Sequence, residues 1–375
     1  MASIRKRIWT SGGAEKTAWV VDYKDQEGKR VLKTLATKRE ADAFRTEMGY
    51  EVSQGTHTPA RASITVAQAG KEWVKQGELD GLERATVREY RNHLKHHINP
   101  LLGTVKLSDL SVPTVNNFRN RLLEHGCSQA MAKKALGSLG ALIATAQDNG
   151  RVSRNVVREM TGRRKRGTKR HKKRVEIPTK DEIRSMLNEA EGHWRPLIVT
   201  AIFTGFRASE LRGLSWEHVD FDNKVIHVRQ RADRWNEIGT PKSEAGTRDV
   251  PIPPMVVNTL KEWKLACPEG PLDLVFPNGR GNIENLGNIH RRGFGALQIA
   301  GGIVKDDGKP KYGIQALRHA AASLFIEQGL TAKRVQAIMG HSSIQMTFDT
   351  YGHLFPSPDD DQAAMEQIEA RLVHG

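Results

Sequence analysis

The stretch Thr204-Gly-Phe-Arg207-Ala-Ser-Glu210-Leu-Arg-Gly-Leu-Ser-Trp216 is the first of five short motifs in the second half of this 375-residue sequence. Each later motif also carries a residue suited to phosphate chemistry. They are Thr240-Pro-Lys242-Ser-Glu-Ala-Gly-Thr-Arg248, Ala316-Leu-Arg318-His319, Met339-Gly-His341-Ser-Ser343 and Thr350-Tyr351-Gly-His353. Any one motif is a weak signal. Five in this order form a specific pattern of arginine, lysine, arginine, histidine and tyrosine.

This ordered set resembles the tyrosine recombinase (phage integrase) family over roughly residues 177–355. The resemblance implies a DNA strand transferase that needs no metal, ATP or other cofactor. It also implies a β-rich N-terminal arm-binding domain, a helical core-binding domain and a mixed, mostly α-helical catalytic domain. The expected fold class is therefore multidomain and mainly α-helical, with small β-sheets.

The resemblance gives each motif residue a role in phosphoryl transfer. Tyr351 would be the nucleophile, forming a 3′-phosphotyrosine that stores the bond energy. Attack on a phosphodiester adds negative charge to the non-bridging oxygens, which the guanidiniums of Arg207 and Arg318 can neutralise in place of Mg²⁺. His341 would donate another hydrogen bond to those oxygens. Lys242 would be the general acid that protonates the leaving 5′-hydroxyl.

One position departs from the family pattern. The family usually carries histidine, sometimes lysine, three residues before the second arginine, and this sequence has Gln315 there. An amide forms hydrogen bonds but cannot carry a proton, so we expect a recognisable site that works more slowly. Glu210 is expected to support the arginine cluster. A competing structural interpretation pairs Arg207 with Glu210 on a helix and makes Tyr351 a core residue.

The positive charge of the chain is concentrated in one short segment. The formal net charge is +15, and nine of those excess charges fall between residues 163 and 174, where no acidic residue occurs. The segment is either a solvated linker or a linker that lies along a phosphate backbone, and its place between two well-patterned regions favours the second interpretation. The nine residues are Arg163, Arg164, Lys165, Arg166, Lys169, Arg170, Lys172, Lys173 and Arg174.

Residues 1–58 predict a small β-sheet plus a helix. Trp19, Val21 and Tyr23 alternate along one strand, a second strand is expected over residues 30–35, and Thr37-Lys-Arg-Glu40 is a capping box that opens a helix. The resemblance makes this block the domain that holds arm-type DNA sites.

Residues 64–158 predict a four-helix, core-binding domain. Apolar residues keep a helical period over residues 66–74 and 87–98, with Pro100 expected to end the second helix, and further helices are expected over 111–126 and 128–150. The second helix carries a basic stripe opposite its apolar face, which fits either contact with phosphates or a merely solvated face. The stripe consists of Arg84, Arg88, Arg91 and Lys95.

The remaining chain predicts a basic linker over residues 159–178, a catalytic domain over 179–355 and a C-terminal tail helix over 356–375. The catalytic domain should contain strands over 219–228, turning at Asp222-Asn223, and over 247–252. The tail helix is too short to be stable alone, and the family's habit suggests docking in trans on a neighbouring protomer.

Composition and motifs exclude other classes of protein. The longest mostly apolar stretch, residues 196–206, is about half the length of a membrane-spanning helix, and the N-terminus does not resemble a signal peptide. Cys127 and Cys267 without a CxxC motif exclude a disulfide scaffold or zinc ribbon. No nucleotide-binding loop or HExxH motif is present, and the histidines at 93–97 lack a carboxylate or thiolate partner for a metal. We expect a cytoplasmic protein of the host cell, acting at the nucleoid.

The sequence as a whole predicts a three-domain integrase that cuts and rejoins double-stranded DNA, integrating or excising a phage or mobile element. The resemblance implies a tetramer on core-type and arm-type sites, with a directionality factor and a host DNA-bending protein as further partners. The extra N-terminal block favours a temperate-phage or genomic-island integrase over the shorter chromosome-dimer resolvases. The alternatives are DNA relaxation of the type IB topoisomerase kind and a catalytically impaired DNA-binding or architectural protein.

Overall fold

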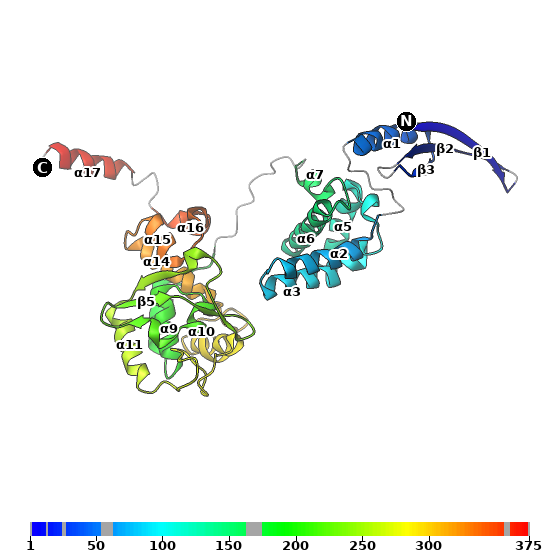
Figure 1. The fold of residues 1–375 in the computed structure, drawn as a ribbon. Helices are drawn as coiled ribbons and strands as arrows, with labels where there is room; N and C mark the ends of the chain where they lie inside the picture. The colour runs from blue at the N-terminus through cyan, green and yellow to red at the C-terminus, as the bar shows by residue number, and fades with distance from the viewer. Residues whose placement is uncertain are drawn as a thin grey trace. The chain divides into compact units, whose positions relative to one another are not determined.

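The computed structural model of the protein is described here for residues 2–12, 14–24, 28–53, 63–162, 175–355 and 361–373. The chain divides into two compact units, residues 1–170 and 171–375 (Figure 1). The described elements are mostly helical with small antiparallel sheets, which confirms the predicted fold class. None of the described helices is long and apolar enough to cross a membrane.

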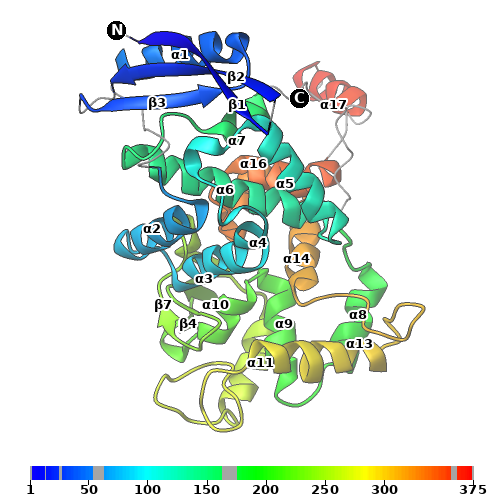
Figure 2. The same cartoon turned by 90° about the vertical axis from the view of Figure 1, so that its right-hand side faces the viewer.

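The first unit begins with a three-stranded antiparallel sheet. Its strands are β1 (Ser3–Ser11), β2 (Ala14–Lys24) and β3 (Arg30–Leu35), in that order across the sheet. Helix α1 (Lys38–Ser53) packs against one face of the sheet (Figure 2), and its start carries the predicted capping box between Thr37 and Glu40. Strand β1 was not predicted, because most of its side chains are exposed and its sequence has no apolar alternation.

A helical cluster with its own hydrophobic core follows in the same unit. Trp73 stacks on Tyr90 with ring centroids 4.0 Å apart, and Phe118 and Leu139 are fully buried. Pro100 does not end the second helix as predicted. The chain continues through a π-helical turn at Leu94–Ile98 into α4, where Pro100 occupies a first-turn position that needs no N–H donor. The helices are α2 (Val66–Leu79), α3 (Arg84–His93), α4 (Asn99–Leu102), α5 (Val112–Glu124), α6 (Gln129–Asp148) and α7 (Val156–Gly162).

The boundaries proposed for the domains and linker stay predictions. Helix α7 extends to Gly162, so the first residues assigned to the basic linker are helical. The nine basic residues at 163–174 lie outside the described residues. Thr179 caps the first helix of the second unit in the predicted capping box with Glu182.

The second unit surrounds small sheets with helices. A three-stranded antiparallel sheet has the order β4-β5-β8, and β6 pairs with β7. The predicted strands over 219–228 and 247–252 correspond to β4, β5 and β8. The strands are β4 (Val219–Asp220), β5 (Val225–Val228), β6 (Arg231–Ala232), β7 (Ile238–Gly239) and β8 (Arg248–Pro251). The helices are α8 (Lys180–Glu189), α9 (Trp194–Thr204), α10 (Ala208–Gly213), α11 (Pro254–Lys264), α12 (Leu286–Asn288), α13 (Ala296–Ala300), α14 (Gln315–Glu327), α15 (Ala332–Met339), α16 (Ile344–Tyr351) and α17 (Asp361–Val373).

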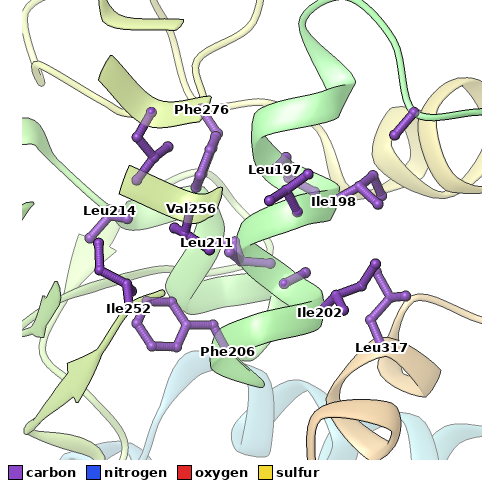
Figure 3. Close-up of a cluster of buried hydrophobic side chains, with 14 of the residues drawn as sticks. Leu197, Ile198, Ile202, Phe206, Leu211, Leu214, Ile252, Val256, Phe276 and Leu317 are labelled. Atoms are coloured by element: carbon purple, nitrogen blue, oxygen red, sulfur yellow. The ribbon is translucent and has the colours of Figure 1, made fainter. Parts of the chain in front are cut away.

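Helix α9 lies at the centre of this unit's core. Figure 3 shows Ile202 beside Leu317 of α14, while Phe206 lies beside Ile252 on the other side of the helix. Almost every α9 side chain is buried, which explains why this helix shows no amphipathic period in the sequence. The motif that follows α9 therefore starts from a rigid, fully packed support.

A left-handed glycine turns the chain from α9 into the first motif. Gly205 has φ of 64°, and a Cβ at this position would lie 2.8 Å from Sδ of Met339 and 3.1 Å from Cβ of Ala321. Only glycine allows α9 to end this close to α14 and α15. This close approach brings Arg207, at the start of α10, next to the residues that follow α15.

Candidate active site

A buried carboxylate organises the arginines of the site. Glu210 on α10 is 3% exposed and accepts hydrogen bonds from Nη1 of Arg207 at 2.7 Å and from the Arg207 backbone N–H at 2.9 Å. Arg248 on β8 donates Nη1 to Oε1 at 3.2 Å and Nη2 to Oε2 at 2.9 Å. Burial raises the pKa of Glu210, but hydrogen bonds and charge from Arg248 and Arg207 outweigh it and lower the pKa below its ordinary value. The carboxylate is therefore ionised.

Arg248 is a site residue that the sequence analysis quoted but did not assign. It lies in a strand whose side chains alternate between buried and exposed, and it occupies a buried position like Val250. An arginine at an inward position of a strand needs a buried partner, which is the signal that could have identified it.

Three further contacts, all with backbone carbonyls, hold the motif arginines. Arg318 on α14 is 3% exposed and donates Nη1 to the carbonyl of Gly205 at 2.6 Å and Nη2 to the carbonyl of Met339. Arg207 donates Nη2 to the carbonyl of Gly340 at 2.8 Å and stays half-buried. Burial, followed by repulsion from Arg207, lowers the pKa of Arg318 to about 9, so it stays protonated at neutral pH. Arg207 thus forms the pair expected from the structural interpretation and also belongs to a larger cationic cluster.

His341 and Tyr351 lie beside this cluster. Their rings are nearly parallel, at an interplanar angle of 13° and with centroids 6.3 Å apart. His341 is buried, its Nδ1 lies 2.9 Å from Oγ1 of Thr347, and burial together with the charges of Arg318 and Arg207 lowers its pKa to about 4. Its ring is therefore neutral at pH 7. Thr347, on α16, was not identified from the sequence.

The phenol of Tyr351 sits at the end of α16 and is 1% exposed. Its Oη lies 2.7 Å from Nδ1 of His319, the residue after Arg318 on α14. Burial raises the pKa of Tyr351 to about 12, although the charge of Arg318 acts in the opposite direction. His319 was quoted in the sequence motif but was given no role.

The two other predicted site residues lie at the surface. Lys242 is exposed on the loop between β7 and β8. Gln315 is exposed at the first residue of α14, and within the described part of the chain its side chain forms no hydrogen bond. The structure therefore gathers Arg207, Glu210, Arg318, His341 and Tyr351 without showing a contact of Gln315 with them.

The predicted basic stripe in the first unit is exposed. Arg84, Arg88, Arg91 and Lys95 lie on the outer side of α3 and the following π-helical turn, and Arg91 pairs with Glu78. Val87 and Ile98 on the same segment are buried in the core.

Among the residues that the structure describes, no three histidine, cysteine or acidic side chains gather as a metal site.

Sequence comparisons identify the family of both units. The phage integrase family matches residues 177–357, and the phage integrase N-terminal SAM-like domain matches residues 65–123. A tyrosine recombinase XerC-like protein of Caldanaerobacter subterraneus subsp. tengcongensis is 26% identical over 365 residues, covering 89% of this chain and 90% of its own length. An integrase of Streptomyces ambofaciens is 28% identical over 355 residues, covering 87% and 86% of the two chains.

Solved structures share the fold. The Tn1549 transposon integrase in complex with a circular intermediate DNA aligns with a TM-score of 0.68 at 23% identity, covering 82% of this chain and 100% of that one. A lambda integrase tetramer bound to a Holliday junction aligns with a TM-score of 0.58 at 20% identity, covering 90% and 95%.

Fold, site and relatives together define a site-specific recombinase of the tyrosine type, an enzyme that transfers DNA strands. The resemblance found in the five motifs is thereby confirmed. The chain belongs to the phage integrase family.

Proposed function

We propose that this recombinase cleaves DNA through Tyr351 and integrates or excises a phage or other mobile element. The observation that carries the proposal is the charge balance beside the phenol. Among the described residues, Arg207 and Arg248 donate to the carboxylate of Glu210, whereas the buried Arg318 donates only to carbonyls and feels the charge of Glu210 without bonding to it. Buried cations require anionic partners, and the phosphodiester of a bound DNA strand would supply the missing negative charge.

Each group of the cluster has a role in this chemistry. Arg207 and Arg318 bind the non-bridging oxygens and stabilise the charge that builds up as Tyr351 attacks phosphorus. His341, neutral and with Nδ1 engaged by Thr347, donates Nε2–H to the same oxygens when its proton resides there. Lys242 protonates the leaving 5′-oxygen after its surface loop closes on the DNA. The product is a 3′-phosphotyrosine, and the reverse attack by a 5′-hydroxyl rejoins the strand.

The remaining parts of the chain bind DNA and other protomers in this proposal. The β-sheet domain reads arm-type sites, the helical domain grips the core site with the basic stripe of α3, and the linker at 163–174 follows the phosphate backbone. The related lambda integrase is a tetramer on a Holliday junction, which supports a tetramer here. Helix α17 exposes 64% of Met365 and 80% of Leu372, apolar surface that docking on a neighbouring protomer would cover. A directionality factor and a host DNA-bending protein complete the assembly in the host nucleoid.

Trapping of a covalent adduct tests the proposal. On nicked DNA that prevents religation, the wild-type protein is expected to form an adduct that survives denaturation. Tyr351→Phe should bind the same DNA and form none, because only the nucleophilic oxygen is removed. Tyr312→Phe is the matched control, since Tyr312 is also a buried tyrosine, with its hydroxyl bonded to Glu182, and it should retain the adduct. An adduct formed normally by Tyr351→Phe would refute the assignment.

A further inference from the structure

Among the described residues, the hydroxyl of Tyr351 has one side-chain hydrogen-bond partner, and that partner is a histidine. His319 places Nδ1 2.7 Å from Oη of Tyr351, with ring centroids 5.7 Å apart and planes at 58°. Both side chains come from well-formed helices, α14 and α16, so the contact is held from two sides. The distance between Nδ1 and Oη is short enough for a general base to remove the phenolic proton.

The phenol needs such a base. With its pKa raised to about 12, Tyr351 has only about one molecule in 10⁵ ionised at pH 7. The position where the family usually places histidine holds Gln315, whose exposed amide cannot accept a proton. His341 has its Nδ1 engaged by Thr347, and the pKa of about 4 makes it a very weak base.

We propose that His319 is the general base that removes the phenolic proton of Tyr351 during DNA cleavage. The inference rests on the proposed function of Tyr351. As the O–H bond breaks, the proton moves to Nδ1 of His319 and the oxygen's electron pair forms the bond to phosphorus. The bond between phosphorus and the 5′-oxygen then breaks, and that oxygen takes its proton from Lys242. In religation the 5′-hydroxyl returns its proton to Lys242 as its oxygen attacks phosphorus, and the proton on His319 returns to Tyr351 as the phosphotyrosine bond breaks.

The surroundings of His319 suit this role. The titratable or charged groups that face it are Arg318 from its own helix, Tyr351 from α16 and His341 from the loop after α15. Burial, then the charge of Arg318, lowers the pKa of His319, so its ring is neutral at pH 7 and free to accept a proton. The imidazolium formed on proton transfer would be repelled by Arg318. The negative charge of the bound phosphate offsets this repulsion at the moment of reaction.

The variant His319→Asn separates proton transfer from positioning. Asparagine keeps an acceptor oxygen near the place of Nδ1 but cannot hold a proton. Single-turnover cleavage of nicked DNA should fall by about 10²–10⁴-fold at pH 7 with unchanged DNA affinity. The same loss should persist on DNA with a bridging 5′-sulfur, whose leaving thiolate needs no acid, whereas Lys242→Ala should regain its rate there. The matched control His193→Asn, at an exposed histidine of the same unit, should cleave normally.

The pH dependence gives a second readout that does not require the variant to fold. On the sulfur substrate the wild-type rate should be flat from pH 7 to 8, because His319 is already neutral there and Arg318, with its pKa of about 9, is still protonated. A tenfold rise per pH unit across that range would mean that hydroxide removes the proton, and would overturn the inference. His319→Asn cleaving at the wild-type rate would also overturn it, leaving His319 as a positioning residue. Neither result affects the proposed function, which fails only if Tyr351→Phe still forms the adduct.

Discussion

Replacing the buried carboxylate, Glu210→Gln, should destabilise the second unit strongly. The substitution keeps the size of the side chain and one acceptor oxygen but removes the charge that Arg207 and Arg248 share. Removing one partner of a buried ion pair typically costs about 3–5 kcal/mol, because the other charge is left buried without compensation. A domain of this size loses about 2–4 °C of Tm per kcal/mol, so the expected drop is about 6–20 °C.

Thermal and urea unfolding of the full chain, followed by circular dichroism and tryptophan fluorescence, measures this loss. Trp216 lies in the core of the second unit and contributes to the signal of its unfolding, while Trp73 contributes to the signal of the first unit. Glu191→Gln, at an exposed glutamate of the same unit, is the matched control and should change stability by less than about 0.5 kcal/mol.

The structure also predicts how the difference in stability between wild type and Glu210→Gln depends on pH. The pKa of Glu210 is lowered in the folded protein, so its contribution is complete above the unfolded pKa of about 4.3 and is lost as pH falls through the folded pKa. The stability gap between wild type and Glu210→Gln should therefore be constant above about pH 5 and shrink at lower pH. A gap below 1 kcal/mol at pH 7 would show that carbonyl contacts alone hold the arginines, and would refute this account.

Three further outcomes are expected. Gln315→His should raise single-turnover cleavage at neutral pH by about tenfold or less without changing DNA affinity; a slower variant would mean that the site is built around the amide. Replacing four basic residues within 163–174 by glutamine should lower the slope of log K against log[salt] by about 0.9 for each lost phosphate contact, whereas an unchanged slope would make the segment a solvated spacer. Deleting residues 357–375 should weaken tetramer assembly on DNA while monomers still bind the core site, as gel shifts would show; normal assembly would mean that α17 packs in cis or not at all.

The motif residues were predictable because each lies in a short local pattern, and the structure gathers five of them. The contacts that complete the cluster were not predictable, because they join distant segments. Arg248 meets Glu210 across 38 positions, and His319 meets Tyr351 across 32. The alternation of side chains along the strand shows that Arg248 faces inward, but it does not show which acidic residue it contacts. Local pattern also fails at β1, whose exposed side chains give no alternation to detect.

In the proposed function, the charge arrangement around Glu210 also prepares the site for DNA. Without DNA, the cations are held by Glu210 and by the carbonyls of Gly205 and Gly340, dipoles that orient a guanidinium without cancelling its charge. Burial, followed by repulsion from Arg207, lowers the pKa of Arg318 to about 9, which reflects how far this charge is removed from water. A phosphodiester entering the cluster therefore meets donors that are already desolvated and fixed, so little reorganisation accompanies the charge that develops on its oxygens. In the proposed mechanism the buried phenol, with its pKa near 12, stays protonated beside His319 until a phosphate is bound. The proposed mechanism would thus confine reactivity to the complex with DNA.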